Sequence, residues 1–340
     1  EDENIRKIAF FANLPDANVI SCYNVETTWD IPILLASQDL NLNMLKHLNV
    51  EFKEYNVNKW IKLSDHIRGL SNASEVRIAI CGKYIKNHDA YYSVIKSLQD
   101  ASFSAQRKLQ IDWLDCSIFD ECESNDEESN EELKKEFWRR LERCHGILVP
   151  GGFGERGVKG MIEVCRYARE NLIPFLGICL GMQVAVIEFT RNVLGIHDAH
   201  SKEFDSQTPN DVITTMNDTD YVQLGGTLRL GAKTTIISDH NSLAYRIYGS
   251  EKISERHRHR YEVNPKYIKQ IQEKGMIFSG KDIDSERMTI CEIPGHPFFF
   301  ASQFHPEFKT HPFGPAPCFL GFILTSSKQF DKFKLYTKER

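Results

Sequence analysis

The stretch PFLGICLGMQ (174–183) changes its pattern at one residue. Residues 174–178 are a short apolar run of the kind that forms a buried strand, whereas residues 181–192 have the spacing of a helix. Cys179 stands between these segments, flanked by Gly177 and Gly181. A nucleophile on a sharp strand-to-helix turn is strained, and small neighbours let the backbone pass closely. The pattern predicts a reactive thiol on such a turn, although a cysteine at this spacing can also be a small core residue.

Strand-like and helix-like segments alternate around this stretch. The strand-like segments are residues 76–81, 109–114, 146–150 and 174–178, and the helix-like ones are 90–104, 133–144, 161–171 and 181–192. Such alternation predicts an α/β fold with a doubly wound, mostly parallel sheet that helices cover on both faces. Ligands bind at the carboxyl ends of the strands in these sheets. Cys179 and the glycine-rich VPGGFGERG (149–157) both stand at such ends.

Changes in composition predict four parts of the chain. They are a piece of a second α/β domain at 1–55, a polar linker at 56–75, the main domain at 76–325 and a disordered, lysine-rich tail at 326–340.

The first part holds two short apolar runs, at 7–11 and 18–22, which predict buried strands. Residues 31–50 predict a helical stretch that begins at Pro32. Within the main domain, the acid-rich residues 120–132 predict a solvated surface insertion rather than a docking site.

The composition excludes several classes of protein. The 340 residues carry a formal net charge of −5, which argues against a dedicated nucleic-acid binder. Nine cysteines without C-x-x-C spacing indicate reduced thiols in a cytoplasmic protein. No apolar run reaches the roughly 18 residues that a membrane span needs. The start, EDENIRK, has neither an initiator Met nor the character of a signal peptide, so we expect Glu1 to mark a cut in a longer protein.

The position of Cys179 favours nucleophilic chemistry. At a helix N-terminus the helix dipole favours the thiolate, which is the form that attacks carbonyl groups. The N–H of Leu180, the next residue, points toward the oxyanion that such an attack creates. Gly152 in the neighbouring loop is a candidate for the second donor.

A second candidate stretch is QFHPEF (303–308), which follows the apolar run FFFAS. Pro306 biases His305 toward an extended conformation. Because residues i and i+2 of an extended segment face the same way, we expect Glu307 to orient His305. That arrangement completes a triad of nucleophile, base and acid with Cys179. The other interpretation of an isolated His-x-Glu is a surface pair.

A third candidate stretch is ERHRHRYEVN (255–264). As a strand, it places Arg256, Arg258 and Arg260 on one face and His257, His259 and Tyr261 on the other. One interpretation is an edge strand that its charges keep from aggregating. Metal binding by the two histidines fits poorly, because no cysteine or carboxylate cluster nearby completes a ligand set. An anionic substrate fits better, since guanidinium binds carboxylate in two-point geometry.

Six motifs together resemble the glutamine amidotransferase (glutaminase) domain of the CTP synthase family. They are GGFGERG, PFLGICLGMQ, SKEF, GGTLRLG, ERHRHRYEVN and QFHPEF. PGG, G-x-C-x-G-x-Q and HPE are general to class I amidotransferases, whereas GGTLRLG with ERHRHRYEVN is more particular to CTP synthases. The resemblance covers nearly all of residues 76–325. Residues 7–50 also resemble the last part of that family's synthetase (amidoligase) domain.

The resemblance implies a role for each matching residue. It makes Cys179 the nucleophile, His305 the general base and acid, and Glu307 its orienter, with Gly152 and Leu180 as the oxyanion hole. The implied glutamine-binding residues are Gly152, Leu180, Gly181, Met182, Gln183, Glu203 and Arg260. Among these, Glu203 suits the α-ammonium group and Arg260 the α-carboxylate.

The resemblance also implies nucleotide sites, and no metal ligands in this chain. Arg156 and Gly157 match positions that respond to GTP, the allosteric activator. Lys7 matches a lysine that contacts the pyrimidine nucleotide, and Tyr23, Asn24 and Val25 match a segment beside the adenine of ATP.

In the full-length family enzyme, ATP with Mg²⁺ phosphorylates UTP, and ammonia from L-glutamine then displaces the phosphate to give CTP. The glutaminase step itself needs no cofactor. The family forms homotetramers and often filaments. This chain contains no G-x-x-x-x-G-K-[ST] phosphate loop, and CGKY (81–84) matches only a strand end. We therefore expect it to lack the kinase-like half of the reaction.

Three alternatives remain open from the sequence. The amidotransferase domain of a GMP synthetase would keep the triad but lack GGTLRLG and ERHRHRYEVN. A γ-glutamyl hydrolase would share the Cys–His chemistry but ordinarily carries a signal peptide. An assembly surface without catalysis is the third, and an intact Cys179, His305 and Glu307 argue against it.

Overall fold

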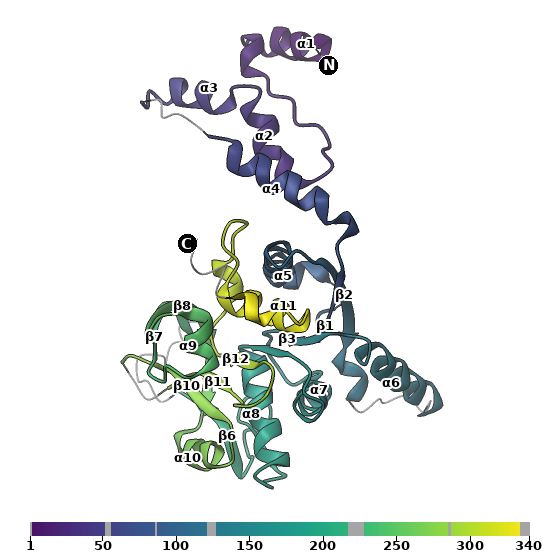
Figure 1. Ribbon diagram of the computed structural model, residues 1–340, viewed down its shortest axis with the longest axis vertical. Helices are drawn as coiled ribbons and strands as arrows, with labels where there is room; N and C mark the ends of the chain where they lie inside the picture. The colour runs from purple at the N-terminus through teal and green to yellow at the C-terminus, as the bar shows by residue number, and fades with distance from the viewer. Residues whose placement is uncertain are drawn as a thin grey trace. The chain divides into compact units, whose positions relative to one another are not determined.

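The computed structural model describes residues 2–51, 56–85, 87–120, 127–216, 228–284 and 287–333. Its contacts divide the chain into two compact units, Glu1–Ala73 and Ser74–Arg340. Each unit is described by itself below (Figure 1).

The described residues of the first unit form helices and no strand. The helices are α1 (Asp2–Ala12), α2 (Ile31–Ala36), α3 (Leu40–His47) and α4 (Asn58–Gly69), with 3₁₀ turns at Asp16–Asn18, Thr28–Asp30 and Leu70–Asn72. The helical prediction at 31–50 is confirmed, with an interruption before Asp39, whose φ is +54°. Helix α4 occupies most of residues 56–75, for which the sequence predicts a polar linker.

The two strands predicted in this unit are wrong. Residues 7–11 lie in α1, where Phe10 and Phe11 are 81% and 85% exposed. Asn18 ends a 3₁₀ turn and residues 19–22 are irregular, and the side chain of Gln38 takes the place of a partner strand. It accepts from Ser21 N at 2.8 Å and donates to Ser21 O at 2.8 Å. A strand needs a neighbour for its N–H and C=O groups, and the described residues of this unit supply none.

The second unit is built on a sheet of nine described strands in the order β2-β1-β3-β4-β12-β11-β10-β7-β8. The strands are β1 (Glu75–Gly82), β2 (Lys108–Asp115), β3 (Gly146–Val149), β4 (Phe175–Ile178), β7 (Arg229–Ile237), β8 (Lys252–His259), β10 (Ile277–Asp282), β11 (Met288–Glu292) and β12 (Phe299–Ser302). The pairs from β2 to β12 are parallel, and those from β12 to β8 are antiparallel. The four strands predicted in 76–178 are confirmed.

Helices cover both faces of this sheet (Figure 1). They are α5 (Tyr92–Ser104), α6 (Glu127–Leu141), α7 (Val158–Glu170), α8 (Leu180–Asn192), α9 (Leu243–Tyr248), α10 (Pro265–Glu273) and α11 (Pro317–Ser326). Side chains of α6, α7 and α8 share one hydrophobic core, and those of α5, α9 and α11 share the other. Alternate residues of β1 enter the two cores, with Ala79 and Cys81 in the first and Ile78 and Ile80 in the second. This confirms the doubly wound α/β prediction.

A small second sheet contains β5 (Ala199–Ser201), β6 (Asn210–Thr215) and β9 (Tyr261–Val263). The ERHRHRYEVN segment is shared between the sheets, because β8 is the last strand of the large sheet and β9 belongs to the small one. Arg260 lies between them. The predicted alternation is confirmed, since Arg256 and Arg258 are exposed and His257 and His259 are buried.

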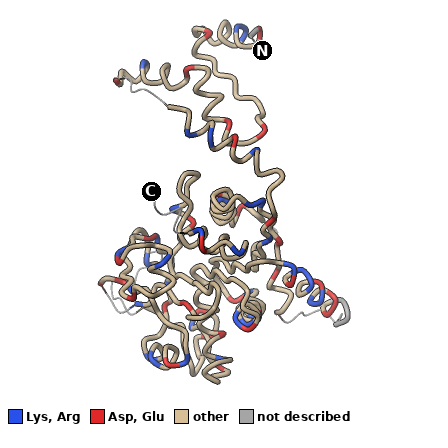
Figure 2. The backbone as a smooth tube through the Cα atoms, viewed as in Figure 1, with Lys and Arg blue, Asp and Glu red and all other residues tan. Residues whose placement is uncertain are grey.

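Two predicted surface segments are described only in part. Residues 121–126 of the acid-rich run lie outside the described residues, and Glu127–Leu141 is helix α6, which carries both acidic and basic side chains (Figure 2). In the tail, residues 334–340 lie outside the described residues. The disorder predicted for 326–333 is wrong, because Phe330–Lys332 forms a 3₁₀ turn and Phe333 is buried in a hydrophobic core.

Candidate active site

The turn between β4 and α8 is strained at Cys179. Its φ and ψ are +54° and −98°, a region that side chains other than glycine rarely adopt. The flanking glycines are required by space. A Cβ at Gly181 would lie 2.1 Å from Val149 O, and one at Gly177 would lie 2.9 Å from Ala301 Cβ. The predicted strand-to-helix turn is therefore confirmed, with a backbone reason for both glycines.

The Cys179 side chain is 5% exposed. Its Sγ lies 3.8 Å from the carbonyl oxygen of Arg258 and 3.6 Å from Nε2 of Gln303. The backbone N–H donates to Ser302 O at 2.7 Å, which connects the turn to the end of β12. Because β12 is parallel to β4, the segment after β12 begins beside the thiol.

That segment contains His305 and Glu307. Nδ1 of His305 lies 2.7 Å from Oε1 of Glu307, so the structure brings the predicted pair together. The route differs from the prediction, because Pro306–Lys309 forms a 3₁₀ turn rather than an extended segment. His305 precedes that turn with φ −109° and ψ +86°, outside the helical region as its position before Pro306 requires.

The His305 ring and the Cys179 side chain interact beside Gly151. A Cβ at Gly151 would lie 2.9 Å from His305 Cε1 and 3.5 Å from Cys179 Cβ, so this glycine lets the two side chains approach. Burial lowers the pKa of His305, but its interactions with the Cys179 sulfur and with the Glu307 carboxylate outweigh burial and raise that pKa to about 10. The imidazole of His305 therefore holds a proton at neutral pH. The Nε2 atom donates to no described nitrogen or oxygen.

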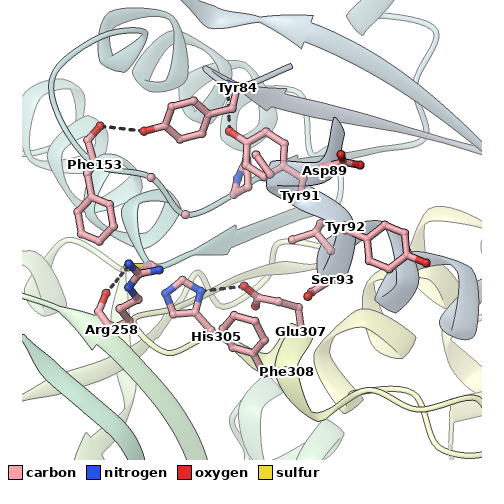
Figure 3. A pocket seen from close by; sticks show the side chains of 16 residues that line it. Tyr84, Asp89, Tyr91, Tyr92, Ser93, Phe153, Arg258, His305, Glu307 and Phe308 are labelled. Carbon is pink, nitrogen blue, oxygen red and sulfur yellow. Dashed lines mark hydrogen bonds and ion pairs between the residues drawn. The ribbon is translucent and has the colours of Figure 1, made fainter. Parts of the chain in front are cut away.

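Two cavities meet at the thiol, and Gly152, Phe153, Cys179 and Arg258 line both. The first, of about 320 Å³, also contains the His305–Glu307 pair and the aromatic rings of Tyr84, Tyr91 and Tyr92 (Figure 3). The second cavity has a volume of about 500 Å³. Its other lining residues are Gly154, Gln183, Glu203, Leu228, His259, Arg260 and Tyr261.

The residues expected to bind glutamine divide into two groups. Gln183, Glu203 and Arg260 line the second cavity together with Cys179. Glu203 is held there by the N–H of Gly154, which donates to its Oε1 at 2.9 Å. Leu180, Gly181 and Met182 line neither cavity, and the side chains of Leu180 and Met182 are buried in the core.

The two expected oxyanion donors lie at the start of α8 and in the loop after β3. Leu180 is the first residue of α8, so its N–H lies in the first turn, where no intrahelical acceptor exists. Gly152 is adjacent, since a Cβ there would lie 3.4 Å from Leu180 Cδ2. The structure thus brings Gly152 and Leu180 next to each other beside Cys179.

Lys83 is a site residue that the sequence prediction missed. It is 3% exposed, and its Nζ donates to Phe153 O at 3.1 Å and also to Gly154 O. Burial, partly offset by Glu203, lowers the pKa of Lys83 to about 8. This ammonium group holds the loop that contains Gly152. The available signal was its position at the carboxyl end of β1, where ligands gather in such sheets.

The residues expected to respond to GTP lie in the next part of the same loop. Arg156 Nη2 donates to Lys83 O at 2.7 Å, and its guanidinium lies 5.7 Å from the centre of the Tyr84 ring. Gly157, with φ +76°, donates its N–H to Asp120 Oδ2 at 2.7 Å. Arg156 also lines a cavity of about 480 Å³ beside the start of α7.

The residues expected to contact other nucleotides lie in the first unit. Tyr23, Asn24 and Val25 line a hollow of about 480 Å³ together with Arg68. Lys7 lies on α1, is exposed, and forms a 2.8 Å ion pair with Glu3. It is not among the residues that line that hollow.

The two histidines of β8 hydrogen-bond to each other. His257 Nδ1 and His259 Nε2 are 3.0 Å apart, and His259 Nδ1 donates to Tyr261 O at 2.9 Å. Burial is the largest cause that lowers the pKa of each ring to about 3. Both are therefore neutral at pH 7. Among the described residues, no group of three His, Cys, Asp or Glu side chains is arranged to hold a metal ion.

Comparison with known proteins agrees with this geometry. The protein-family model "Glutamine amidotransferase class-I" matches residues 87–325, so the chain belongs to the class I glutamine amidotransferases. The glutaminase domain of Trypanosoma brucei CTPS, solved with bound acivicin, is 39% identical with a TM-score of 0.67. That match covers 75% of this chain and 94% of the solved one.

Curated relatives point to the same enzyme. The CTP synthase of Thermococcus kodakarensis is 43% identical over 97% of this chain and 59% of its own length. The CTP synthase of Drosophila melanogaster is 42% identical over 96% of this chain and 52% of its own length. The chain is therefore a glutaminase region of the CTP synthase type, and it spans little more than half the length of these relatives. In the described residues, no helix combines the length and the hydropathy that crossing a membrane requires.

Proposed function

We propose that this chain hydrolyses L-glutamine with Cys179 as nucleophile, His305 as general base and acid, and Glu307 as the residue that orients His305. The observation that carries the proposal is the strained cysteine at the start of α8, packed through Gly151 against a histidine that a buried carboxylate holds at 2.7 Å. The raised pKa of His305 supports a resting pair of thiolate and imidazolium.

In the first half of the reaction, the Cys179 thiolate attacks the side-chain amide carbon of glutamine. The N–H groups of Leu180 and Gly152 donate to the oxygen that becomes negative. His305 then gives its proton from Nε2 to the leaving nitrogen, the C–N bond breaks, and ammonia departs. A thioester of Cys179 remains.

In the second half, a water molecule replaces ammonia. Neutral His305 takes a proton from that water, whose oxygen attacks the thioester carbon. The C–S bond breaks, glutamate leaves, and the thiolate–imidazolium pair is restored. Throughout, Glu307 keeps the proton of Nδ1 directed toward itself, so that Nε2 remains the nitrogen that exchanges protons.

The second cavity, which Glu203 and Arg260 line, is the proposed glutamine site. Its volume of about 500 Å³ suits an amino acid with its water. Glu203 binds the α-ammonium group, Arg260 the α-carboxylate, and Gln183 a polar group near the thiol. The backbone N–H of Gly181 and Met182 is a less direct candidate, because neither residue lines the cavity.

In the full-length enzyme we propose that the released ammonia converts UTP to CTP with ATP and Mg²⁺. Lys7, Tyr23, Asn24 and Val25 belong to that synthetase side, and the assembly is a cytoplasmic homotetramer with a capacity for filaments. This chain contains no phosphate loop, so it makes no CTP by itself, whatever the nitrogen source.

Activation by GTP acts through Arg156 and Gly157. The hydrogen bond from Arg156 to the Lys83 carbonyl supports this, because Lys83 in turn holds Phe153 and Gly154, next to Gly152. A shift of about 1 Å in an oxyanion donor can cost roughly 10²-fold in rate. We therefore expect slow glutamine turnover by this chain, with weak stimulation by GTP unless the synthetase domain is supplied.

The direct test is covalent labelling with acivicin, a glutamine analogue. We expect one adduct, mapped by mass spectrometry to Cys179, and loss of at least about 10³-fold in ammonia release from glutamine in Cys179→Ala. In the full-length enzyme the same variant should still make CTP from free ammonia. An adduct on another cysteine, or equal loss with both nitrogen sources, would assign Cys179 a structural role.

A further inference from the structure

Gln303 lies between the end of β12 and His305 and has no role in the mechanism described so far. It is 1% exposed, and its N–H donates to Thr289 O at 2.9 Å. Its side-chain Nε2 donates to Cys179 Sγ at 3.6 Å, a length suited to sulfur, whose radius exceeds that of oxygen. Its Oε1 accepts from Gln183 Nε2 at 3.3 Å.

The direction of this amide is determined by a backbone carbonyl. Gln183 Nε2 also lies 3.3 Å from Tyr261 O, and a carbonyl oxygen can only accept. Gln183 must therefore present its NH₂ group to Tyr261 and to Gln303. The oxygen of Gln303 is thereby directed toward Gln183, which leaves its NH₂ group for the sulfur.

The sulfur thus has one donor and one acceptor beside it. The Arg258 carbonyl, 3.8 Å from Sγ, can only accept, so it favours the protonated thiol. The Gln303 amide donates, and a hydrogen bond donated to an ionised group stabilises the ionised form. Together with the charged His305, Gln303 shifts the balance toward the thiolate.

We propose that Gln303 is a catalytic residue that stabilises the Cys179 thiolate by donating its amide N–H to Sγ. The inference rests on the proposed function, in which that thiolate is the nucleophile. Gln183, which lines the glutamine cavity, orients the amide, so the substrate site and the nucleophile are joined by one chain of hydrogen bonds.

The test is the rate at which iodoacetamide alkylates Cys179 at pH 7, followed by peptide mass spectrometry. In Gln303→Leu we expect that rate to fall about tenfold, because the thiolate loses a hydrogen bond to a charged group. The deficit should shrink as pH rises, since hydroxide then forms the thiolate without the amide. Gln303→Glu retains an acceptor for Gln183 but places a carboxylate beside the sulfur, and it should react more slowly still.

The matched control is Gln270→Leu, the same substitution at an exposed position on α10. Its alkylation rate should equal that of the unchanged chain. Circular dichroism establishes that each variant is folded. If Gln303→Leu does not fold, Gln303→Glu, which keeps the size of the side chain, is used for the test instead.

The outcomes separate this inference from the proposed function. Cys179 reacting no faster than the exposed Cys22 in the unchanged chain would count against the nucleophile itself. If Cys179 is reactive but both Gln303 variants are alkylated at the rate of the unchanged chain, the role of Gln303 alone is overturned. A rise in the KM for glutamine with unchanged alkylation would also overturn it, because Gln303 would then act on the substrate.

Discussion

Glu307 reaches back to His305 across the single residue Pro306, with Oε1 2.7 Å from Nδ1. Glu307 is buried and His305 is half-buried, and the 3₁₀ turn that contains Glu307 fixes their separation. The carboxylate has a second oxygen, Oε2, that is buried without a hydrogen-bond partner among the described residues. The charge of Glu307 is therefore directed largely at the imidazole.

Glu307→Gln should lower kcat for glutamine hydrolysis by about 10²- to 10⁴-fold, because the amide keeps the size but can hold His305 in the wrong tautomer. Loss of the carboxylate also removes a cause of the raised pKa of His305. The imidazolium then loses its proton at lower pH, so the alkaline limb of the pH profile of kcat/KM should shift to lower pH. A pH–rate profile measures both, and an unchanged alkaline limb would contradict the electrostatic role.

Arg260→Lys should raise the KM for glutamine about tenfold to a hundredfold with a smaller change in kcat. Lysine keeps the charge but loses the planar fork that binds a carboxylate at two points. Arg256→Lys is the matched control, because Arg256 is exposed on the same face of the segment and lines neither active-site cavity. Equal KM values for the two variants would show that Arg260 is a solvated surface charge and does not bind the α-carboxylate.

Asp100→Asn should stabilise the fold at neutral pH. Asp100 is buried on α5, where burial, opposed by a hydrogen bond from Thr310, raises its pKa from 3.8 to about 6. Ionisation therefore opposes folding: the cost is absent below pH 3.8 and complete above about pH 6. We expect a gain of about 1–3 kcal/mol in the free energy of unfolding at pH 7.5, and none below about pH 4.

Chemical denaturation at the two pH values measures this gain. Asp331→Asn, at an exposed position after α11, is the control and should leave the free energy of unfolding unchanged at both. The same gain at low and neutral pH would mean that the effect comes from packing rather than from charge.

Cys179→Gly should be more stable than Cys179→Ala by about 1 kcal/mol. Both variants lack the thiol, but only alanine has to adopt φ +54° with a Cβ. A non-glycine residue in such a region costs about 1–3 kcal/mol, against which glycine loses about 0.5–1 kcal/mol of entropy on folding. Thermal melts of the two variants compare them directly, and a more stable alanine variant would show that the turn stores no strain.

Local patterns predicted the parts of the site that the backbone dictates. Gly177 and Gly181 are required because strand and helix pass within contact distance, and a short apolar run beside a helical period marks that passage in the sequence. The His305–Glu307 contact was also predicted, because both residues lie within one short segment. Its extended geometry was not, since a proline after His305 is compatible with a following 3₁₀ turn as well.

Contacts between segments that are far apart in the sequence were harder to predict from it. Lys83 contacts carbonyl groups 70 and 71 residues away, and Gln303 contacts a sulfur 124 residues away. Neither pairing leaves a periodic signal in the sequence. The prediction of strands at 7–11 and 18–22 was wrong for a related reason. A short apolar run is compatible with a strand or a helix, and the presence or absence of a neighbouring strand decides between them.

Under the proposed function, the passage of the chain from β8 to β9 at Arg260 separates glutamine recognition from bond breaking. Cys179 and His305 follow strands of the large sheet, whereas Glu203 follows β5 of the small sheet and Arg260 lies at the crossing. Residues of the small sheet and the crossing would thus bind the α-ammonium and α-carboxylate groups of glutamine. Residues that follow strands of the large sheet would hydrolyse its side-chain amide. Substitutions that shift the small sheet should change which amide is accepted, and their effect on the thiol should pass through Gln183 and Gln303. Selectivity and rate therefore depend on different sheets, and the hydrogen bonds from Tyr261 through Gln183 and Gln303 to Cys179 connect the two.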